Sequence, residues 1–361
     1  MSVLYVLSRR GFGRWGWSRA IGQALESRVL ATVSFLLQRR SLERAITFGR
    51  RVFTTLGPRS VAHRDLVANL AVLHPDATTP QLQARAKRTW GWFGVAFAEL
   101  AHIRELSVSV GDRVELRISP EVDRVLRAPG RSAVFATAHV GPWLLTNLVA
   151  MHYGFPLTTT VPTSANPGMD RVLRGLLRAL PIEQVTHAEG TAPLSDELER
   201  GHKITLAVDG WDEYGHEVPM FGERMRLDPA AARLAVRHDC PLIPIHALRL
   251  PDGRYRLVAE RVLSPGDPKV HAETRAQRLT NEFAKDLERW IRAVPGQWLC
   301  LTPRWAEATV VGAMTRVNEL TLQQTDTTVR ISEEELDAEL TRRGMVGDTQ
   351  TTGGANRPPQ A

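Results

Sequence analysis

The sequence predicts an α/β fold in which a central, mostly parallel sheet is flanked by helices and preceded by a helical N-terminal layer. Residues 20–105 carry apolar side chains at three- and four-residue spacing, the pattern of amphipathic helices. From about residue 113, short β-branched runs alternate with helical ones, which is typical of parallel strands joined by helices. The chain has 361 residues, 43% of them hydrophobic, so it can bury a sizeable core.

These patterns divide the chain into three regions. We expect a helical, membrane-associating region over residues 1–105, an α/β domain over 106–306 and a partly disordered C-terminal extension over 307–361. Within the first region, Thr79 before Pro80 is expected to cap a helix, because proline fits the first helical turn.

The elements of the α/β region can be read in chain order. The strand candidates are VELRI, SAVFATAH, LTTTV, IEQVTH, KITLAVD, PLIPIHAL and RYRLVAERVL. The helix candidates between and after them are MDRVLRGLLRAL, TAPLSDELERG, DPAAARLAVRHD and residues 274–293. In the extension, Ser332 and Glu335 have capping-box spacing and predict one short helix, followed by a tail with the composition of a disordered segment.

Arginine is concentrated near the N-terminus. Residues 1–70 hold twelve arginines and no lysine against three acidic residues, an excess larger than the net charge of +7 of the whole chain. Aromatic residues such as Trp15 and Trp17 lie among these arginines, and such a mixture suits the headgroup region of an anionic membrane. A solvated helix face is the alternative. Nucleic acid is a third option, but no helix-turn-helix, zinc-finger or RNA-recognition signature supports it, and we expect no nucleic-acid partner.

Two further classes of protein are disfavoured. The longest apolar run near the N-terminus, VLATVSFLL, is far too short to cross a bilayer, so we expect no transmembrane helix. Cys240 and Cys300 are the only cysteines, which leaves no disulfide framework or cysteine-rich zinc site, and we expect no metal.

Two polar residues stand at the carboxyl ends of strand candidates, where ligands gather in sheets of this kind. His139 follows SAVFATA, and Asp209 follows KITLAV. Gly141 next to the histidine would let a substrate approach the backbone, and Trp143 would supply a flat apolar wall. A core histidine bonded to the backbone is the alternative for His139. If both strands end at one edge of the sheet, an imidazole and a carboxylate share one cleft.

Five motifs in the right order resemble the bacterial lysophospholipid acyltransferases, in the branch of lipid A late acyltransferases and phosphatidylinositol mannoside acyltransferases. HVGPW is similar to the H-x-G-x-W signature of that family. The other four are NLAVLHPDAT, NPGMDRVLRGLLR, AVDGWDEYGHEVPMFG and PGQWLCLTPRW. The resemblance runs from Asn69 to Trp305 and implies a glycerolipid-acyltransferase-like fold.

The resemblance also implies a chemistry. A fatty acyl group would pass from a thioester to a hydroxyl or amine of a lipid or amphipathic acceptor, with His139 taking the proton of the acceptor. The thioester of acyl carrier protein or coenzyme A would be a co-substrate, and no cofactor would be bound. Membrane lipids and acyl carrier protein would be the partners. The family implies a peripheral place on the cytosolic face of a bacterial inner membrane.

The sequence departs from the family pattern at three positions. Leu144 stands five residues after His139, where the family has the carboxylate that orients the histidine. Pro162 stands about where an arginine is expected, and Asp228 where a glycine is common. Either another carboxylate orients the histidine, with Asp209 as our candidate, or the protein binds lipids or acyl chains with weakened catalysis.

Further binding residues are expected around the cleft. Arg174 and Arg178 share a helix face with Arg171 and could grip a phosphate, although a solvated stripe is the alternative. Asp212, on the acidic loop after Asp209, completes the set of expected substrate-binding residues. The Pro-Gln-Trp motif reads as structural, packing the last strand and helix against the sheet.

Overall fold

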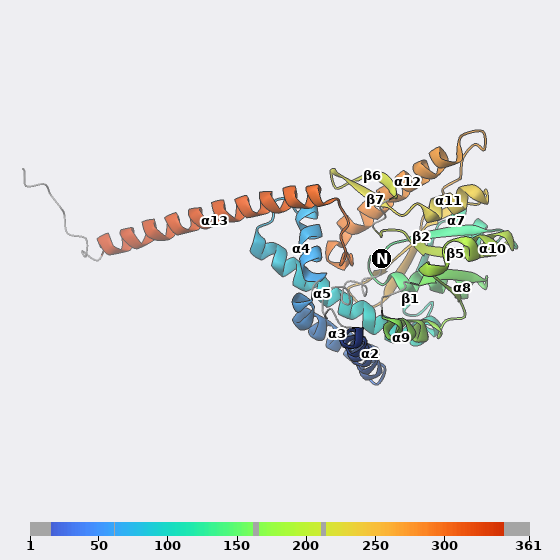
Figure 1. The fold of residues 1–361 in the computed structure, drawn as a ribbon, viewed down its shortest axis with the longest axis horizontal. Coiled ribbons are helices and arrows are strands. Elements are labelled where there is room, and N and C mark those ends of the chain that lie inside the picture. Colours follow the sequence, from blue (N-terminus) through green and yellow to red (C-terminus); the bar gives the residue numbers. More distant parts are fainter. Residues whose placement is uncertain (1–15, 61, 162–165, 211–213, 343–361) are drawn as a thin grey trace, which may run out of the picture.

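A computed structural model describes residues 16–60, 62–161, 166–210 and 214–342, and it confirms the α/β class (Figure 1). Its central sheet has five described strands in the order β4-β3-β5-β2-β8, and all neighbouring pairs are parallel. The strands are β2 (Ala133–Thr137), β3 (Leu157–Val161), β4 (Glu183–Thr186), β5 (Lys203–Ala207) and β8 (Leu242–Pro244).

The pairing of β2 with β5 decides where the two candidate residues lie. The register runs from Ala133 opposite Lys203 to Thr137 opposite Ala207. His139 and Asp209 each come two residues after this last pair, so both leave the sheet at the same edge. Neighbouring parallel strands that end in register therefore bring the two side chains together.

Two smaller sheets complete the described strands. One contains β1 (Val114–Ile118), β10 (Tyr255–Ala259) and β9 (His246–Arg249), with β1 parallel and β9 antiparallel to β10. The other is the hairpin of β6 (His216–Met220) and β7 (Glu223–Leu227), which the sequence did not predict. Its turn residues Phe221 and Gly222 both have positive φ, the conformation that a two-residue hairpin turn needs. Phenylalanine is an unusual residue for this conformation.

The N-terminal part is helical as far as the structure describes it. Its helices are α2 (Gly16–Gln38), α3 (Leu42–Leu56), η1 (Gly57–Arg59), α4 (Ala62–Leu73), α5 (Thr79–Ala101) and α6 (Ile103–Val108). The cap of α5 is Thr78, not Thr79, because Thr78 and Gln81 form a capping box while Pro80 lies in the first turn. Among the described helices, none is long and apolar enough to span a bilayer.

The remaining helices connect and cover the strands. They are α7 (Pro120–Arg127), η2 (Trp143–Asn147), α8 (Leu148–Tyr153), α9 (Pro167–Leu177), η3 (His187–Glu189), α10 (Ala192–Glu199), α11 (Ala230–Arg237), α12 (Ala272–Ala293), η4 (Pro295–Gln297) and α13 (Glu307–Arg342).

Each face of the central sheet has its own core. Val134 packs with Leu66 and Trp90 of the N-terminal helices, whereas Phe135 packs with Leu37 and Val95. Successive side chains of a strand point to opposite faces, so the N-terminal helices contribute to both cores.

The C-terminal helix differs from the expectation. A short helix starting near Ser332 is wrong, because α13 begins at Glu307 and extends away from the rest of the molecule (Figure 1). Its first turns are held by packing, since Ala313 and Val317 are fully buried in the first core. The predicted disordered tail lies outside the described residues.

Two glycines allow α3 and α5 to cross closely. A methyl group added at Gly49 would lie 2.4 Å from the carbonyl oxygen of Gly94, and one added at Gly94 would lie 2.2 Å from that of Gly49. Real Cβ atoms do not approach a backbone oxygen this closely, so the two helices touch backbone to backbone.

We predict that Gly94→Ala lowers the free energy of unfolding by about 1–3 kcal/mol, because the added methyl forces α3 and α5 apart. Gly175→Ala is the matched control, since open space surrounds that helical glycine, and it should stabilise the protein by up to about 1 kcal/mol. Urea unfolding midpoints measure both changes. Equal effects at the two positions would contradict the close crossing.

Candidate active site

The loop after β2 presents His139 at the edge of the sheet. Its side chain is 25% exposed, and its ring lies 5.1 Å from the ring of Trp143, centroid to centroid. The imidazole therefore has a tilted aromatic ring on one side, as expected for Trp143. A substrate-binding role for Trp143 stays a prediction.

Asp209 meets His139 from the adjacent strand. Oδ1 of Asp209 lies 2.7 Å from Nδ1 of His139 and also accepts the backbone N–H of His139 at 3.2 Å. A carboxylate only accepts, so the hydrogen bond places the ring proton on Nδ1. Nε2 then keeps its lone pair, which is the form of imidazole that can take a proton from another molecule.

The second oxygen of Asp209 contacts residues of PGQWLCLTPRW, residues 295–305, which we call the closing motif. Nε1 of Trp298 donates to Oδ2 at 2.9 Å, and Nη2 of Arg304 lies 3.6 Å from the same oxygen. Nη1 of Arg304 also donates to the backbone carbonyl of Asp209 at 2.6 Å. The carboxylate is thus bound on both oxygens, although it is fully buried.

These contacts decide the ionisation of Asp209. Burial alone would raise its pKa, because the charged form loses its water. The electrostatic interaction and hydrogen bond with His139, the charge of Arg304 and the hydrogen bond from Trp298 outweigh burial and hold the pKa of Asp209 well below its ordinary value. The buried group is therefore a carboxylate at neutral pH.

Asn69 anchors the closing motif. Its side-chain nitrogen donates to the carbonyls of Cys300 and Thr302, each at 2.7 Å, and its side-chain oxygen accepts the backbone N–H of Arg304 at 3.1 Å. The Asn-Leu motif of α4 and the Pro-Gln-Trp motif, more than 200 residues apart, thus meet beside Asp209. Reading the Pro-Gln-Trp motif only as packing missed this contact with the site.

Gly141 has a structural reason to be glycine. Its φ is +60°, and a Cβ there would lie 2.5 Å from the carbonyl oxygen of Ala247. Its own N–H donates to the carbonyl of Gln297 at 3.0 Å. The close approach at this position is to the protein backbone, and a substrate-binding role for Gly141 stays a prediction.

Leu144 lies against the N-terminal helices. It is half-buried in η2 and lines a small cavity with Ala96, Leu100 and Ile103 of α5 and α6, and Glu99 also lines this cavity. A carboxylate here would enter a mostly apolar cavity beside the carboxyl group of Glu99, whereas position 209 already supplies a partner for His139.

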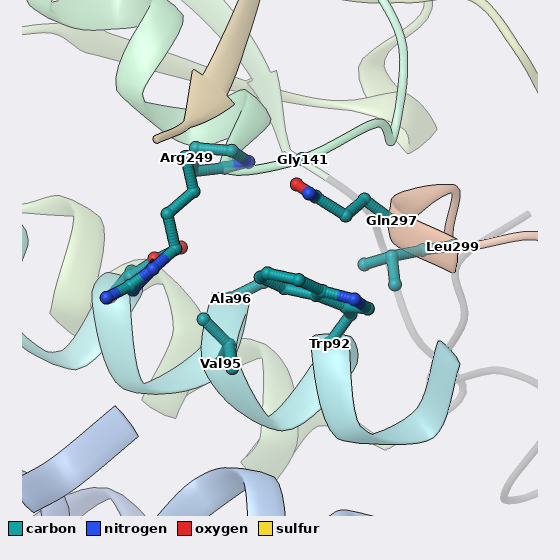
Figure 2. A pocket seen from close by; sticks show the side chains of 9 residues that line it. Trp92, Val95, Ala96, Gly141, Arg249, Gln297 and Leu299 are labelled. Carbon is teal, nitrogen blue, oxygen red and sulfur yellow. Dashed lines mark hydrogen bonds and ion pairs between the residues drawn. The ribbon is translucent and has the colours of Figure 1, made fainter. Parts of the chain in front are cut away.

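A buried ion pair borders a small cavity on the α5 side of the loop (Figure 2). Nη1 of Arg249 lies 3.2 Å from Oε1 of Glu99, and the cavity is closed by Trp92, Gly141 and Gln297. Burial raises the pKa of Glu99 to about 7, although the nearby arginines oppose the shift. The sequence pattern did not single out Glu99 or Arg249, since each is one charged residue among many in its segment.

The remaining expected binding residues are Arg174, Arg178 and Asp212. Arg174 lies in the last turn of α9, where it is half-buried, and Arg178 is the exposed cap residue that follows. Within the described residues, neither forms a hydrogen bond or ion pair with His139 or Asp209, and their binding role stays a prediction. Asp212 and Pro162 lie outside the described residues. Asp228 accepts the backbone N–H of Ala230 at 2.8 Å, at the start of α11.

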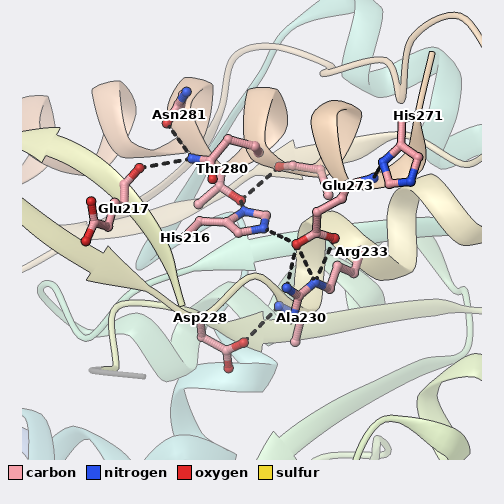
Figure 3. A network of polar contacts seen from close by, with 11 residues as sticks. His216, Glu217, Asp228, Ala230, Arg233, His271, Glu273, Thr280 and Asn281 are labelled. Carbon is pink, nitrogen blue, oxygen red and sulfur yellow. Dashed lines mark hydrogen bonds and ion pairs between the residues drawn. The ribbon is translucent and has the colours of Figure 1, made fainter. Parts of the chain in front are cut away.

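A second histidine network has a structural role (Figure 3). His216 of the β6–β7 hairpin contacts Thr280 and Glu273 of α12, each at 2.8 Å, and Arg233 of α11 binds the same carboxylate. Hydrogen bonds from Arg233 and His216 lower the pKa of Glu273 to about 2. The network fastens the hairpin to two helices.

With the site in view, comparison with known proteins decides the family. The model of the bacterial lipid A biosynthesis acyltransferases matches residues 27–307 of the chain. The chain belongs to this family. The match includes both His139 and Asp209, together with Asn69, Trp298 and Arg304.

Two curated relatives are similar to this acyltransferase family member. The phosphatidylinositol mannoside acyltransferase of Mycolicibacterium smegmatis is 29% identical over 183 residues, which are 49% of this chain and 57% of the relative. The protein of the same name from Mycobacterium tuberculosis is 28% identical over 279 residues, 73% of this chain and 83% of the relative. The first alignment thus spans little more than half of that relative.

One solved structure is also similar. The 1-acyl-sn-glycerophosphate acyltransferase PlsC from Thermotoga maritima matches with a TM-score of 0.31 and 12% identity, over 73% of this chain and 97% of that one.

We predict that Leu144→Asp fails to raise the rate of acyl transfer from a thioester and lowers the free energy of unfolding by about 2 kcal/mol, because the charge enters a mostly apolar cavity that Glu99 also lines. Leu144→Met, which conserves volume, is the control and should cost less than about 1.5 kcal/mol. Transfer rates and urea midpoints are the measurements. A rate above that of the unaltered protein would show that position 144 can serve His139 after all.

Proposed function

We propose that this protein transfers a fatty acyl group from an acyl thioester to a hydroxyl or amine of a lipid or amphipathic acceptor, with His139 as the base and Asp209 as its partner. The observation that carries the proposal is the contact of 2.7 Å between Nδ1 of His139 and Oδ1 of Asp209. It supplies from another strand the carboxylate that Leu144 cannot provide.

The proposed reaction needs no covalent enzyme intermediate. Nε2 of His139 takes the proton of the acceptor as its oxygen or nitrogen attacks the thioester carbonyl. The tetrahedral intermediate then breaks its carbon–sulfur bond, and the imidazolium returns the proton to the departing thiolate. Asp209 stabilises the imidazolium between these two steps and keeps the ring in one tautomer.

The acceptor and donor belong to the proposal as classes. Both curated relatives are named for phosphatidylinositol mannosides, so a mannosylated phosphatidylinositol is the first acceptor to test. An acyl thioester of coenzyme A or of acyl carrier protein is the proposed co-substrate. An assay of acyl transfer with different thioesters would identify the donor carrier and the preferred length of the acyl chain.

A weakened, lipid-binding homologue is the second candidate function. The lack of a carboxylate at position 144 would favour such a homologue. Because Asp209 lies within hydrogen-bond distance of His139, the residue at position 144 no longer favours a lipid-binding homologue.

We predict that His139→Ala lowers transfer from an acyl thioester by about 10²–10⁴-fold, because the base is lost. Asp209→Asn should also lower turnover by roughly 10²-fold or more with little change in the Michaelis constant for the thioester, since the amide keeps the size but not the charge. Thiol release from an acyl-coenzyme A measures both.

The exposed His152→Ala and Asp252→Asn are the matched controls and should transfer at the normal rate. If His139→Ala also keeps the normal rate, the proposed function is wrong and lipid binding becomes the better account.

We further propose that the protein lies peripherally on the cytosolic face of a bacterial inner membrane and contacts it through α2. Leu25 and Val29 are 59% and 55% exposed and one turn apart on this helix, and Phe35 is 54% exposed. Arg28 and Arg39 are exposed beside them, and the guanidinium of Arg39 lies 4.7 Å from the ring centre of Phe35. Apolar side chains flanked by arginines suit an anionic lipid surface.

We predict that Leu25→Glu combined with Val29→Glu weakens binding to vesicles containing phosphatidylglycerol by about ten-fold or more, because the change removes insertion and adds repulsion. Leu322→Glu, at an equally exposed position of α13, is the control and should bind normally. Co-sedimentation with the vesicles is the measurement. Equal binding by both variants would place the membrane contact elsewhere.

Substitution is the better test than removal of the N-terminal helices. Leu37, Leu42 and Ile46 of α2 and α3 are buried in the second core, so a deletion up to residue 60 would expose that core.

A further inference from the structure

The strongest unassigned feature of the site is the set of groups behind Asp209. In the proposed reaction His139 and Asp209 act directly. The fully buried carboxylate of Asp209 must also stay charged and directed at one nitrogen of His139, which requires further groups. A buried aspartate without compensation becomes neutral, and a neutral carboxyl group stabilises an imidazolium poorly.

The two oxygens of Asp209 have separate partners. Oδ1 receives Nδ1 and the backbone N–H of His139, whereas Oδ2 receives Nε1 of Trp298 and faces Arg304. With Oδ2 occupied, the fully buried carboxylate cannot rotate without losing the hydrogen bond from Trp298. This division leaves Oδ1 directed at the histidine.

The segment that carries Trp298 is bonded to the loop that carries His139. Val140 and Trp298 form an antiparallel bridge, Leu299 donates its N–H to the carbonyl of His139 at 2.8 Å, and Gly141 donates to Gln297. The partner of Oδ2 and the partner of Oδ1 are therefore fixed to each other by backbone hydrogen bonds. Asn69 fixes the same segment from α4.

Arg304 is almost as deeply buried as the carboxylate of Asp209. Only 2% of it is exposed, and its guanidinium lies 5.8 Å from the ring centre of Trp298. A buried arginine is costly unless an anion and hydrogen-bond acceptors compensate it. Asp209 supplies both the anion and a carbonyl acceptor, so the two buried charges depend on each other.

We propose that Trp298 and Arg304 are positioning residues of the transfer reaction, which keep Asp209 ionised and directed at Nδ1 of His139. This inference rests on the proposed function. It assigns to the closing motif an effect on the reactivity of the histidine, beyond the packing of the last strand and helix.

The test compares two tryptophans of the same motif. Trp298→Phe removes the N–H that serves Oδ2 and keeps an aromatic ring. Trp305→Phe is the matched control, because Trp305 is also buried, packs edge-on against Trp298 at 5.9 Å, and has an indole N–H without a hydrogen-bond partner in the described structure. We expect kcat to fall about ten-fold or more for Trp298→Phe at unchanged KM, and to stay near normal for Trp305→Phe.

A double-mutant cycle separates positioning from general damage to the fold. If Trp298 acts through the charge of Asp209, adding Trp298→Phe to Asp209→Asn should lower kcat no further. A full additional ten-fold loss in that background, or equal losses for Trp298→Phe and Trp305→Phe, overturns the inference. The assay is thiol release from an acyl-coenzyme A with a mannosylated phosphatidylinositol as acceptor.

The pH profile tests Arg304. Removing its charge with Arg304→Gln raises the proton affinity of the His139–Asp209 pair, so the acid limb of kcat/KM should move to higher pH by about one unit. Arg304→Lys restores a positive charge and should return the limb toward its normal place. An unmoved limb in a folded Arg304→Gln protein counts against the inference, and if that variant does not fold, the tryptophan comparison decides alone.

These outcomes can be told apart from a failure of the proposed function. If His139→Ala keeps the normal rate, the reaction itself is misassigned. If His139→Ala is inactive but the Trp298→Phe and Trp305→Phe variants behave alike, only the positioning inference fails.

Discussion

The ionised, fully buried carboxylate of Asp209 is the interaction on which the rest of the site depends. It fixes the ring of His139 through Nδ1, and it in turn requires Trp298 and Arg304, because an unpaired charge cannot be kept in this interior. Arg304 is held by the segment that Asn69 anchors. The strands β2 and β5, the helix α4 and the closing motif thus converge on one residue.

This convergence also bears on position 144, one of the three positions at which the chain departs from the family pattern. The histidine needs a carboxylate near Nδ1, but the chemistry does not prescribe the strand from which it comes. With Asp209 in place, position 144 is available for an apolar side chain that packs with α5 and α6. Leu144 itself offers no carboxylate, and the carboxylate that contacts His139 is that of Asp209.

The fold class and the central contact were accessible from the sequence because both follow from local patterns. Alternating strand and helix signals predict a parallel sheet, and strand ends predict where His139 and Asp209 emerge. The strands of the β6–β7 hairpin were missed because the segment after Asp209 reads as an acidic loop, and the start of α13 was missed because tertiary packing of Val317 outweighed a capping pattern. Partners such as Arg304 and Glu99 could not be found, since their role comes from contacts between distant segments.

The tautomer of His139 tests the account most directly. Two-bond ¹H–¹⁵N correlation spectra of protein labelled at histidine, assigned with His139→Gln and recorded where the imidazole is neutral, report which ring nitrogen carries the proton. The account predicts a proton on Nδ1, held by Asp209, and an unprotonated Nε2. A proton on Nε2, or rapid exchange between the two tautomers as in a free imidazole, would contradict it.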